Sequence, residues 1–172
     1  MQSTASAADL IAFEEEMAEL FAAGEIRSPL HLAGGNENHL IEIFRDIRPN
    51  DWVLGSWRSH FHSILKGVPR DEVRRAILNG RSIALCFPEY RVLCSAIVGG
   101  IAPIAIGIAW AIKKEWESAD HVNGDIDRVY VFLGDMTVEC GVVHEAMKYA
   151  EGHKLPVTWI VEDNGLSVKT DT

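Results

Sequence analysis

The sequence predicts an α/β protein with a parallel sheet, decorated by helices at its N-terminus. Two runs of β-branched and aromatic residues, 128–133 and 157–162, flank a helical stretch at 138–152. A strand, a helix and a second strand this close together form a right-handed crossover unit, which produces a parallel sheet. The 172 residues, 48% of them hydrophobic, suffice for one domain with its own core.

The spacing of apolar residues predicts the other elements in chain order. Leu10, Phe13, Met17 and Leu20 recur at helical intervals, so the first helix should end near Gly24, a residue type that suits a C-cap. Further along we expect a second amphipathic helix at 38–47, a strand at 52–57, a charged helix at 71–78, a possible strand at 91–95 and a buried helix at 98–114 that is apolar on nearly every face. The chain should thus form a single domain, residues 1–172, with an N-terminal helical part at 1–50.

Composition narrows the classes of function. The net charge of −9 disfavours a nucleic-acid-binding surface, which needs a basic face. The longest apolar stretch, 96–112, is interrupted by three glycines and a proline, so a buried helix explains it better than a membrane span. No basic region followed by an apolar core opens the chain, and Cys86, Cys94 and Cys140 form no CxxC pair. These features favour a cytoplasmic protein with reduced thiols.

Polar residues follow both strands of the predicted crossover. The stretch GDMTVECG, residues 134–141, comes directly after the first strand, and Asn164 comes just after the second. Neighbouring parallel strands end at the same edge of a sheet, where ligands bind. Asp135 and Asn164 should therefore offer a carboxylate and an amide oxygen at one place. Beside the free N–H groups of the following helix, these oxygens suit a magnesium ion bound to a diphosphate.

Two neighbouring residues extend this hypothesis. The backbone carbonyl of Leu166 would supply a third oxygen, and Gly134 would let the backbone approach phosphate groups closely. A purely structural interpretation is equally compatible with the spacing. In that interpretation Asp135 caps the helix and Asn164 forms a turn before Gly165.

Longer stretches carry a family resemblance. GDMTVECGVVHEAMKYAEGHKLPVTWIVEDNGLSV, residues 134–168, resembles the thiamine-diphosphate motif that runs from GDG to NN in the alpha subunit of the 2-oxo-acid dehydrogenases. Three upstream stretches resemble the same family in the same order: FEEEMAELFAAGEIRSPLHL at 13–32, SWRSHFHSILKG at 56–67 and IVGGIAPIAIGIAWAIK at 97–113. The resemblance implies a parallel-sheet thiamine-diphosphate-binding fold, with the chain forming its diphosphate-side domain.

The resemblance also implies site residues. Asp135, Asn164 and the Leu166 carbonyl would bind magnesium. His31 and His60 would be catalytic, the first near the diphosphate and the second near the mouth of the active site. Cofactor contacts are implied for the following residues: Trp57, Arg58, Val98, Gly134, Asp135, Met136, Thr137 and Asn164. The planar guanidinium of Arg58 suits phosphate oxygens, and Trp57 takes the place of a family tyrosine. Without the resemblance, the histidines would be interpreted as surface or interface residues and Val98 as ordinary helix packing.

The sequence departs from the family pattern at four further places. Met136 replaces the second glycine of GDG, and Asp163 replaces the first asparagine of NN. In the shortened loop SIALCFPEYR, Ala84 takes the place of the histidine in the family's SMH. The sequence stops at Thr172, so we expect a form truncated at its C-terminal end. These departures bear on turnover more than on cofactor binding.

The resemblance therefore implies a subunit of a thiamine-diphosphate- and Mg²⁺-dependent enzyme that decarboxylates a 2-oxo acid and transfers an acyl or aldehyde unit. A pyrimidine-binding, beta-type partner subunit would supply the acid–base glutamate, so we expect a hetero-oligomer that binds neither nucleic acid nor membrane. Two other classes stay open. One is a transketolase-like carboligase subunit, and the other is a non-catalytic assembly subunit that retains the fold.

Overall fold

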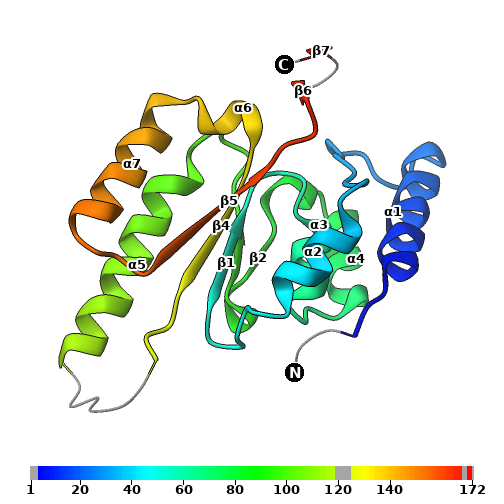
Figure 1. The fold of residues 1–172 in the computed structure, drawn as a ribbon. Coiled ribbons are helices and arrows are strands. Elements are labelled where there is room, and N and C mark those ends of the chain that lie inside the picture. Colours follow the sequence, from blue (N-terminus) through cyan, green and yellow to red (C-terminus); the bar gives the residue numbers. More distant parts are fainter. Residues whose placement is uncertain (1–3, 119–124, 168–169, 172) are drawn as a thin grey trace. The chain divides into compact units, whose positions relative to one another are not determined.

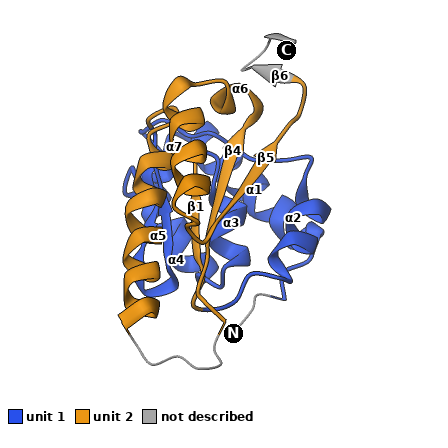
Figure 2. Ribbon diagram, turned by 60° about the vertical axis from the view of Figure 1, so that its left-hand side comes forward, with its two compact units in different colours: residues 1–49, 57–96 blue, residues 50–56, 97–172 orange. Residues whose placement is uncertain are grey.

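The computed structural model describes residues 4–118, 125–167 and 170–171. The chain divides into two compact units, which Figure 2 shows in different colours. Unit 1 consists of residues 1–49 and 57–96, and unit 2 consists of residues 50–56 and 97–172. The chain leaves unit 1 for one short strand of unit 2 and then returns. Each unit is described by itself below.

Unit 2 contains the predicted parallel sheet (Figure 1). Its strands are β1 (Trp52–Gly55), β4 (Val129–Gly134) and β5 (Val157–Glu162), with β4 in the middle. Both pairings are parallel. The middle strand is the most buried, since its side chains at positions 129, 131, 132 and 133 are all 0% exposed. The β-branched and aromatic runs thus form the sheet that the sequence predicts.

The helix expected at 138–152 is two helices. α6 (Asp135–Val138) and α7 (Gly141–Gly152) meet at Cys140, whose extended backbone (φ −70°, ψ 131°) begins α7. An extended residue cannot continue a helical turn, so the chain changes direction there. The predicted strand, helix and strand order is confirmed, with the helical part starting earlier and broken once.

The helix expected at 98–114 is α5 (Ile101–Ser118), shifted toward the C-terminus. Gly99 has φ +71°, a left-handed conformation that keeps residues 97–100 in a turn. Pro103 fits because the N–H groups of a first helical turn need no partner within the helix. The helix is apolar on nearly every face, as expected, but only one stripe of it is buried. The buried residues are Ile101, Ala102, Ala105 and Ala109, so a mostly small-residue stripe packs inward.

Unit 1 holds three of the predicted helices: α1 (Ala7–Ala22), α2 (Glu37–Phe44) and α4 (Arg70–Leu78). Ser6 and Asp9 form a capping box that fixes the start of α1. α3 (His60–Leu65) was not predicted, because all six of its residues are buried, the polar ones included, so no exposed polar face marks its period. The possible strand at 91–95 is confirmed as β3 (Val92–Cys94), and it pairs antiparallel with β2 (Cys86–Phe87).

Short elements complete the structure. Two 3₁₀ helices, η1 (Ser82–Ala84) and η2 (Pro88–Tyr90), flank β2, and a small hairpin of β6 (Leu166–Ser167) and β7 (Thr170–Asp171) follows β5. Within the described ranges, no helix combines the length and the apolar character that crossing a membrane requires.

Candidate functional site

The ends of β4 and β5 lie level with one another in unit 2. Gly134, the last residue of β4, is the register partner of Glu162, the last residue of β5. Asp135 follows the first strand directly, and Asn164 follows the second after one intervening residue. Because the strands are parallel neighbours, both residues lie at the carboxyl edge of the sheet. This is the placement that the sequence predicts for the two oxygen donors.

Gly134 and the short helix α6 shape one side of this edge. Gly134 is the N-cap of α6 with extended backbone (φ −69°, ψ 155°), and Asp135 is the acidic residue of the first turn. Asp135 therefore lies one position after the cap position, which Gly134 occupies. A Cβ atom added at Gly134 would meet Thr137 Oγ1 at 3.8 Å, an ordinary contact. Nothing in the described packing requires glycine there.

The two residues after Asp135 differ in exposure. Met136 is 45% exposed, whereas Thr137 is buried. The thioether of Met136 thus lies at the surface beside Asp135, where the family motif has a glycine. The hydroxyl-bearing side chain of Thr137 belongs to the interior of unit 2.

The loop after β5 forms a turn through Asp163. The backbone N–H of Gly165, which has φ +66°, donates to Asp163 Oδ1 at 2.9 Å. The structural interpretation placed Asn164 in a turn before Gly165, and Asn164 does lie within this turn, although the accepting oxygen belongs to the preceding residue. The aspartate in place of the family asparagine still supplies the oxygen that such a turn needs. Asn164 is exposed, and Leu166 begins β6 immediately after the turn.

The turn at 97–100 packs against the start of α7. A Cβ atom added at Gly99 would lie 2.9 Å from Val142 Cγ1 and 3.4 Å from Val143 Cγ2, so glycine is required by this close approach. The side chain of Val98 stays 51% exposed. Val98, the predicted cofactor-lining residue, therefore lies in a turn that packs against α7, while its own side chain is half exposed.

A second group of predicted site residues lies in unit 1. Arg58 is exposed, and its Nη1 donates to the backbone carbonyl of Leu32 at 2.6 Å. The rings of His31 and Trp57 meet edge to face with centroids 6.3 Å apart. Two segments that are distant in sequence, 31–32 and 57–58, are thereby joined twice. An exposed guanidinium with one donor fixed keeps further donors accessible to an anion.

His31 has an altered acidity. Burial, followed by the positive charge of Arg58 and the nearby His60, holds the pKa of His31 below its usual range. The imidazole of His31 is therefore neutral at pH 7, with one nitrogen that donates and one that accepts.

His60 lies in the interior of unit 1 rather than at the mouth of a site. It is 0% exposed, and both ring nitrogens are engaged: Nδ1 with Glu14 Oε1 at 2.9 Å and Nε2 with Ser82 Oγ at 2.9 Å. Its position at the start of α3 accounts for this difference, because all of α3 is buried. Of the two predicted catalytic histidines, only His31 is partly exposed.

Glu14 and Ser82 are functional candidates that the sequence analysis missed. Glu14 did carry a signal, since it falls on the apolar stripe of α1 beside Leu10, Phe13 and Met17 and is buried with them. A charged residue on the buried stripe of a helix needs a buried partner. Ser82 carried no comparable signal.

The described residues hold no group of three or more histidine, cysteine, aspartate or glutamate side chains that could bind a metal ion. The predicted magnesium ligands would not form such a group, because only Asp135 among them is of these types. The other two ligands are an amide oxygen and a backbone carbonyl, which Mg²⁺ also accepts.

Comparison with known proteins agrees with this arrangement. The family model of the dehydrogenase E1 component matches residues 6–172. The chain is 32% identical over 168 residues to the pyruvate dehydrogenase E1 component subunit alpha of Rickettsia typhi, covering 92% of this chain and 49% of that protein. It is 30% identical over 164 residues to the chloroplastic subunit alpha-3 of the same component from Oryza sativa subsp. japonica, covering 88% of this chain and 38% of the relative.

A relative with a different name matches at similar length. The alpha subunit of acetoin:2,6-dichlorophenolindophenol oxidoreductase from Bacillus subtilis is 27% identical over 169 residues, covering 92% of this chain and 48% of that protein. The chain thus spans less than half the length of each of these three relatives. From the match over nearly all of its residues, we conclude that the chain belongs to the dehydrogenase E1 component family.

Proposed function

We propose that this chain binds thiamine diphosphate with Mg²⁺ and serves as the diphosphate-side subunit of an enzyme that acts on a 2-oxo acid. The observation that carries the proposal is the level ending of β4 and β5, which puts Asp135 and Asn164 at one edge of the sheet. Membership of the dehydrogenase E1 component family supports the same assignment.

The residues of unit 2 fit a magnesium diphosphate. Asp135, Asn164 and the Leu166 carbonyl are three hard oxygen donors around one strand edge, the ligand type that Mg²⁺ prefers. Gly134 is free of any packing demand from its described neighbours, which agrees with a role in leaving room for a ligand. Asp163 adds a negative charge nearby, but one of its oxygens already accepts from Gly165 N–H. The donor set therefore suits the cofactor.

Unit 1 offers groups for an anion and for proton handling. Arg58 would bind phosphate oxygens through the donors that Leu32 does not use. His31, neutral at pH 7, would donate one hydrogen bond to a phosphate oxygen or accept a proton from a bound group. The cofactor itself, when bound, supplies the ring that stabilises the carbanion left by decarboxylation. The chain's own residues bind and orient it.

A partner subunit is part of the proposal. Large apolar side chains of unit 2 are exposed at the starts of its helices: Ile97, Val98, Ile104, Met136 and Val142. Exposed apolar residues in this number favour an interface with another chain. We propose a beta-type, pyrimidine-binding subunit that supplies the acid–base glutamate. A transketolase-like carboligase subunit and a non-catalytic assembly subunit remain the alternatives.

Cofactor binding tests the proposal directly. Asp135→Asn should lower the affinity for thiamine diphosphate at saturating Mg²⁺ by about tenfold or more, because a charged ligand contact contributes roughly 1.5 to 3 kcal/mol. Isothermal titration calorimetry on the full chain, with and without Mg²⁺, measures this. The matched control is Glu151→Gln on the exposed end of α7, which should bind like the unaltered chain.

Two results decide the outcome. Equal affinity of Asp135→Asn and the unaltered chain would remove the metal assignment. A lower affinity of Asp135→Asn would support the metal assignment. Pyruvate and acetoin, the compounds in the names of two matched relatives, should next be compared as substrates in the presence of a partner subunit. Cofactor binding without turnover of any carbonyl substrate would instead favour the assembly subunit.

A further inference from the structure

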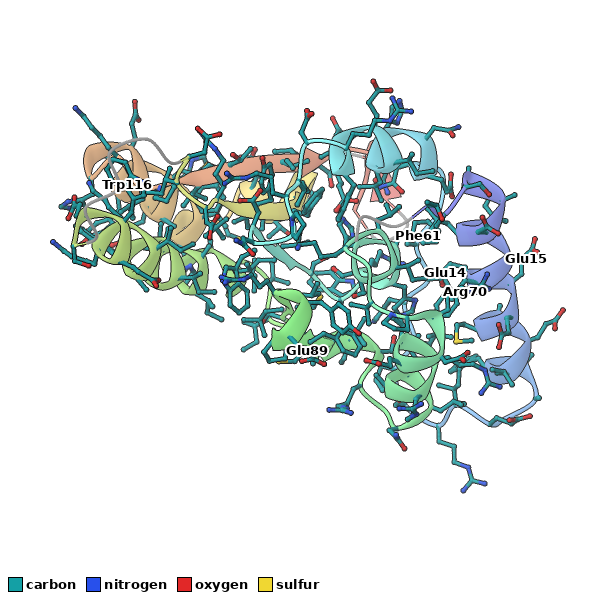
Figure 3. All side chains as sticks on the ribbon, turned by 90° about the horizontal axis from the view of Figure 1, so that it is seen from below. Glu14, Glu15, Phe61, Arg70, Glu89 and Trp116 are labelled. Carbon is teal, nitrogen blue, oxygen red and sulfur yellow. The ribbon has the colours of Figure 1, made fainter. Side chains whose placement is uncertain are left out.

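Glu14, His60 and Ser82 form a buried hydrogen-bonded cluster across three segments of unit 1. They belong to α1, α3 and η1, and their exposed fractions are 6%, 0% and 1%. Glu14 Oε1 and Ser82 Oγ each lie 2.9 Å from a different ring nitrogen of His60. Phe13 meets the ring edge to face, with centroids 6.2 Å apart. Figure 3 labels Glu14 on α1 and, on α3, Phe61, the residue after His60.

The chemistry of the three groups fixes the direction of the bonds. An ionised carboxylate only accepts, so the nitrogen facing Glu14 carries a proton. In the neutral imidazole the other nitrogen accepts from the Ser82 hydroxyl. In the imidazolium form it donates to the same oxygen. Each ring nitrogen of His60 therefore has a partner, and the cluster joins its three segments.

The order of groups matches that of a Ser–His–acid hydrolase site, but burial excludes this use. Such a site needs a serine oxygen that a substrate carbonyl can reach. Ser82 is 1% exposed and His60 is fully buried. The second oxygen of Glu14, Oε2, is buried with no hydrogen-bond partner among the described residues, which makes the bond to His60 the more important.

The position of His60 indicates which segment of the backbone this cluster fixes. His60 begins α3, directly after the segment Trp57–Arg58–Ser59. The other end of this segment is fixed by the Arg58 bond to Leu32 and by the Trp57 contact with His31. If the end at His60 were loose, the backbone that carries the guanidinium would have freedom to shift. A displaced donor loses a charge-assisted hydrogen bond, whose strength depends on distance and angle.

We infer that Glu14, His60 and Ser82 are positioning residues that fix the Trp57–Arg58 segment for binding a diphosphate. This inference rests on the proposed function of Arg58. It gives His60 a different role from the direct catalytic one that the family resemblance implied. His60 acts through Arg58, and its anchors are a glutamate from α1 and a serine from η1.

Ser82→Ala is the variant that tests the inference, because it removes one hydroxyl and leaves the Glu14–His60 bond in place. On the full chain with Mg²⁺, its affinity for thiamine diphosphate should fall about tenfold, the effect of losing one buried hydrogen bond. Ser28→Ala is the matched control. The Ser28 hydroxyl is also buried but has no hydrogen-bond partner in the described part of the chain, so affinity should not change.

A double-variant cycle separates positioning from a general loss of stability. In the Arg58→Ala background, Ser82→Ala should cause no further loss of affinity, because its effect passes through Arg58. An equal loss in both backgrounds would overturn the inference. Glu14→Gln retains an oxygen that accepts from His60, so this variant should bind the cofactor nearly as well as the unaltered chain. A loss of affinity as large as that of Ser82→Ala would contradict the role given to the cluster.

Hydrogen–deuterium exchange gives a readout that does not need the cofactor. Ser82→Ala should increase exchange in the peptide covering 57–60, whereas Ser28→Ala should not. Unchanged exchange in that peptide would overturn the inference even if the unaltered chain binds thiamine diphosphate. If the unaltered chain does not bind the cofactor at all, the proposed function fails. The exchange data alone then decide whether the cluster of Glu14, His60 and Ser82 fixes the Trp57–Arg58 segment.

Discussion

Arg58 is exposed, yet one of its hydrogen bonds is fixed within unit 1. The bond from Nη1 to the Leu32 carbonyl at 2.6 Å orients the planar guanidinium, and this geometry suits a pair of phosphate oxygens. A lysine would keep the charge but would lose both the plane and the paired donors. The residue type therefore matters at this position as much as the charge does.

Arg58→Lys should weaken thiamine diphosphate binding by about tenfold or more, since the charge-assisted contact contributes roughly 1.5 to 3 kcal/mol. Calorimetry at fixed Mg²⁺ measures the change. Arg81→Lys, an exposed arginine elsewhere in unit 1, serves as the control and should leave affinity unchanged. Equal binding by the Arg58 variant would assign this arginine to a surface or interface role.

At the scale of elements, the turn before α5 is held by glycine geometry. Gly99 combines a left-handed backbone with close packing against α7. Gly107 lies within α5 and has no atom within 4 Å of an added Cβ. Glycine is thus required at position 99 but not at position 107, although both glycines lie in one apolar stretch of the sequence.

Gly99→Ala should destabilise the chain by about 1 to 3 kcal/mol, because the left-handed backbone and the overlap with Val142 both oppose a side chain. Gly107→Ala should be neutral or stabilise the chain by up to about 1 kcal/mol, because alanine favours a helix. Urea unfolding followed by circular dichroism measures both. A Gly99 variant that unfolds at the same urea concentration as the unaltered chain would contradict the packing argument.

The elements show where local sequence was a sufficient guide. The strands at 128–133 and 157–162 and the first helix were predicted within a few residues of their observed bounds, because alternating or helical apolar spacing is a local property. α3 was missed because its polar residues are buried together with its apolar ones, so no solvent-facing side marks its period. The break at Cys140 was missed because it depends on one backbone conformation.

At the scale of the whole molecule, exposed apolar residues predict association. Ile97 is 73% exposed and Ile104 is 42% exposed. Expressed alone, the chain should therefore self-associate or be poorly soluble, and size-exclusion chromatography with light scattering measures its mass. The double variant Ile97→Ser with Val98→Ser should shift the population toward monomer.

A matched pair on another surface provides the control for association. Ile11 and Phe21 of α1 are 43% and 49% exposed, and changing both to serine should leave the association unchanged if the turn at 97–100 forms the interface. A stable monomer of the unaltered chain would contradict the prediction that the exposed residues at 97–100 form an interface.

The sequence by itself determined the α/β class, the order of the crossover unit and the placement of Asp135 and Asn164 at one sheet edge. These features depend on local periodicity and on the rule that parallel neighbours end together. Only the tertiary structure decided that Asp163 forms the turn, that Ile97 and Val98 face outward, and that His60 is buried between Glu14 and Ser82. Those outcomes depend on backbone conformation and on which distant residues the folded chain brings together. The partner of a buried polar group depends on which distant segments pack together, and no local sequence pattern specifies this.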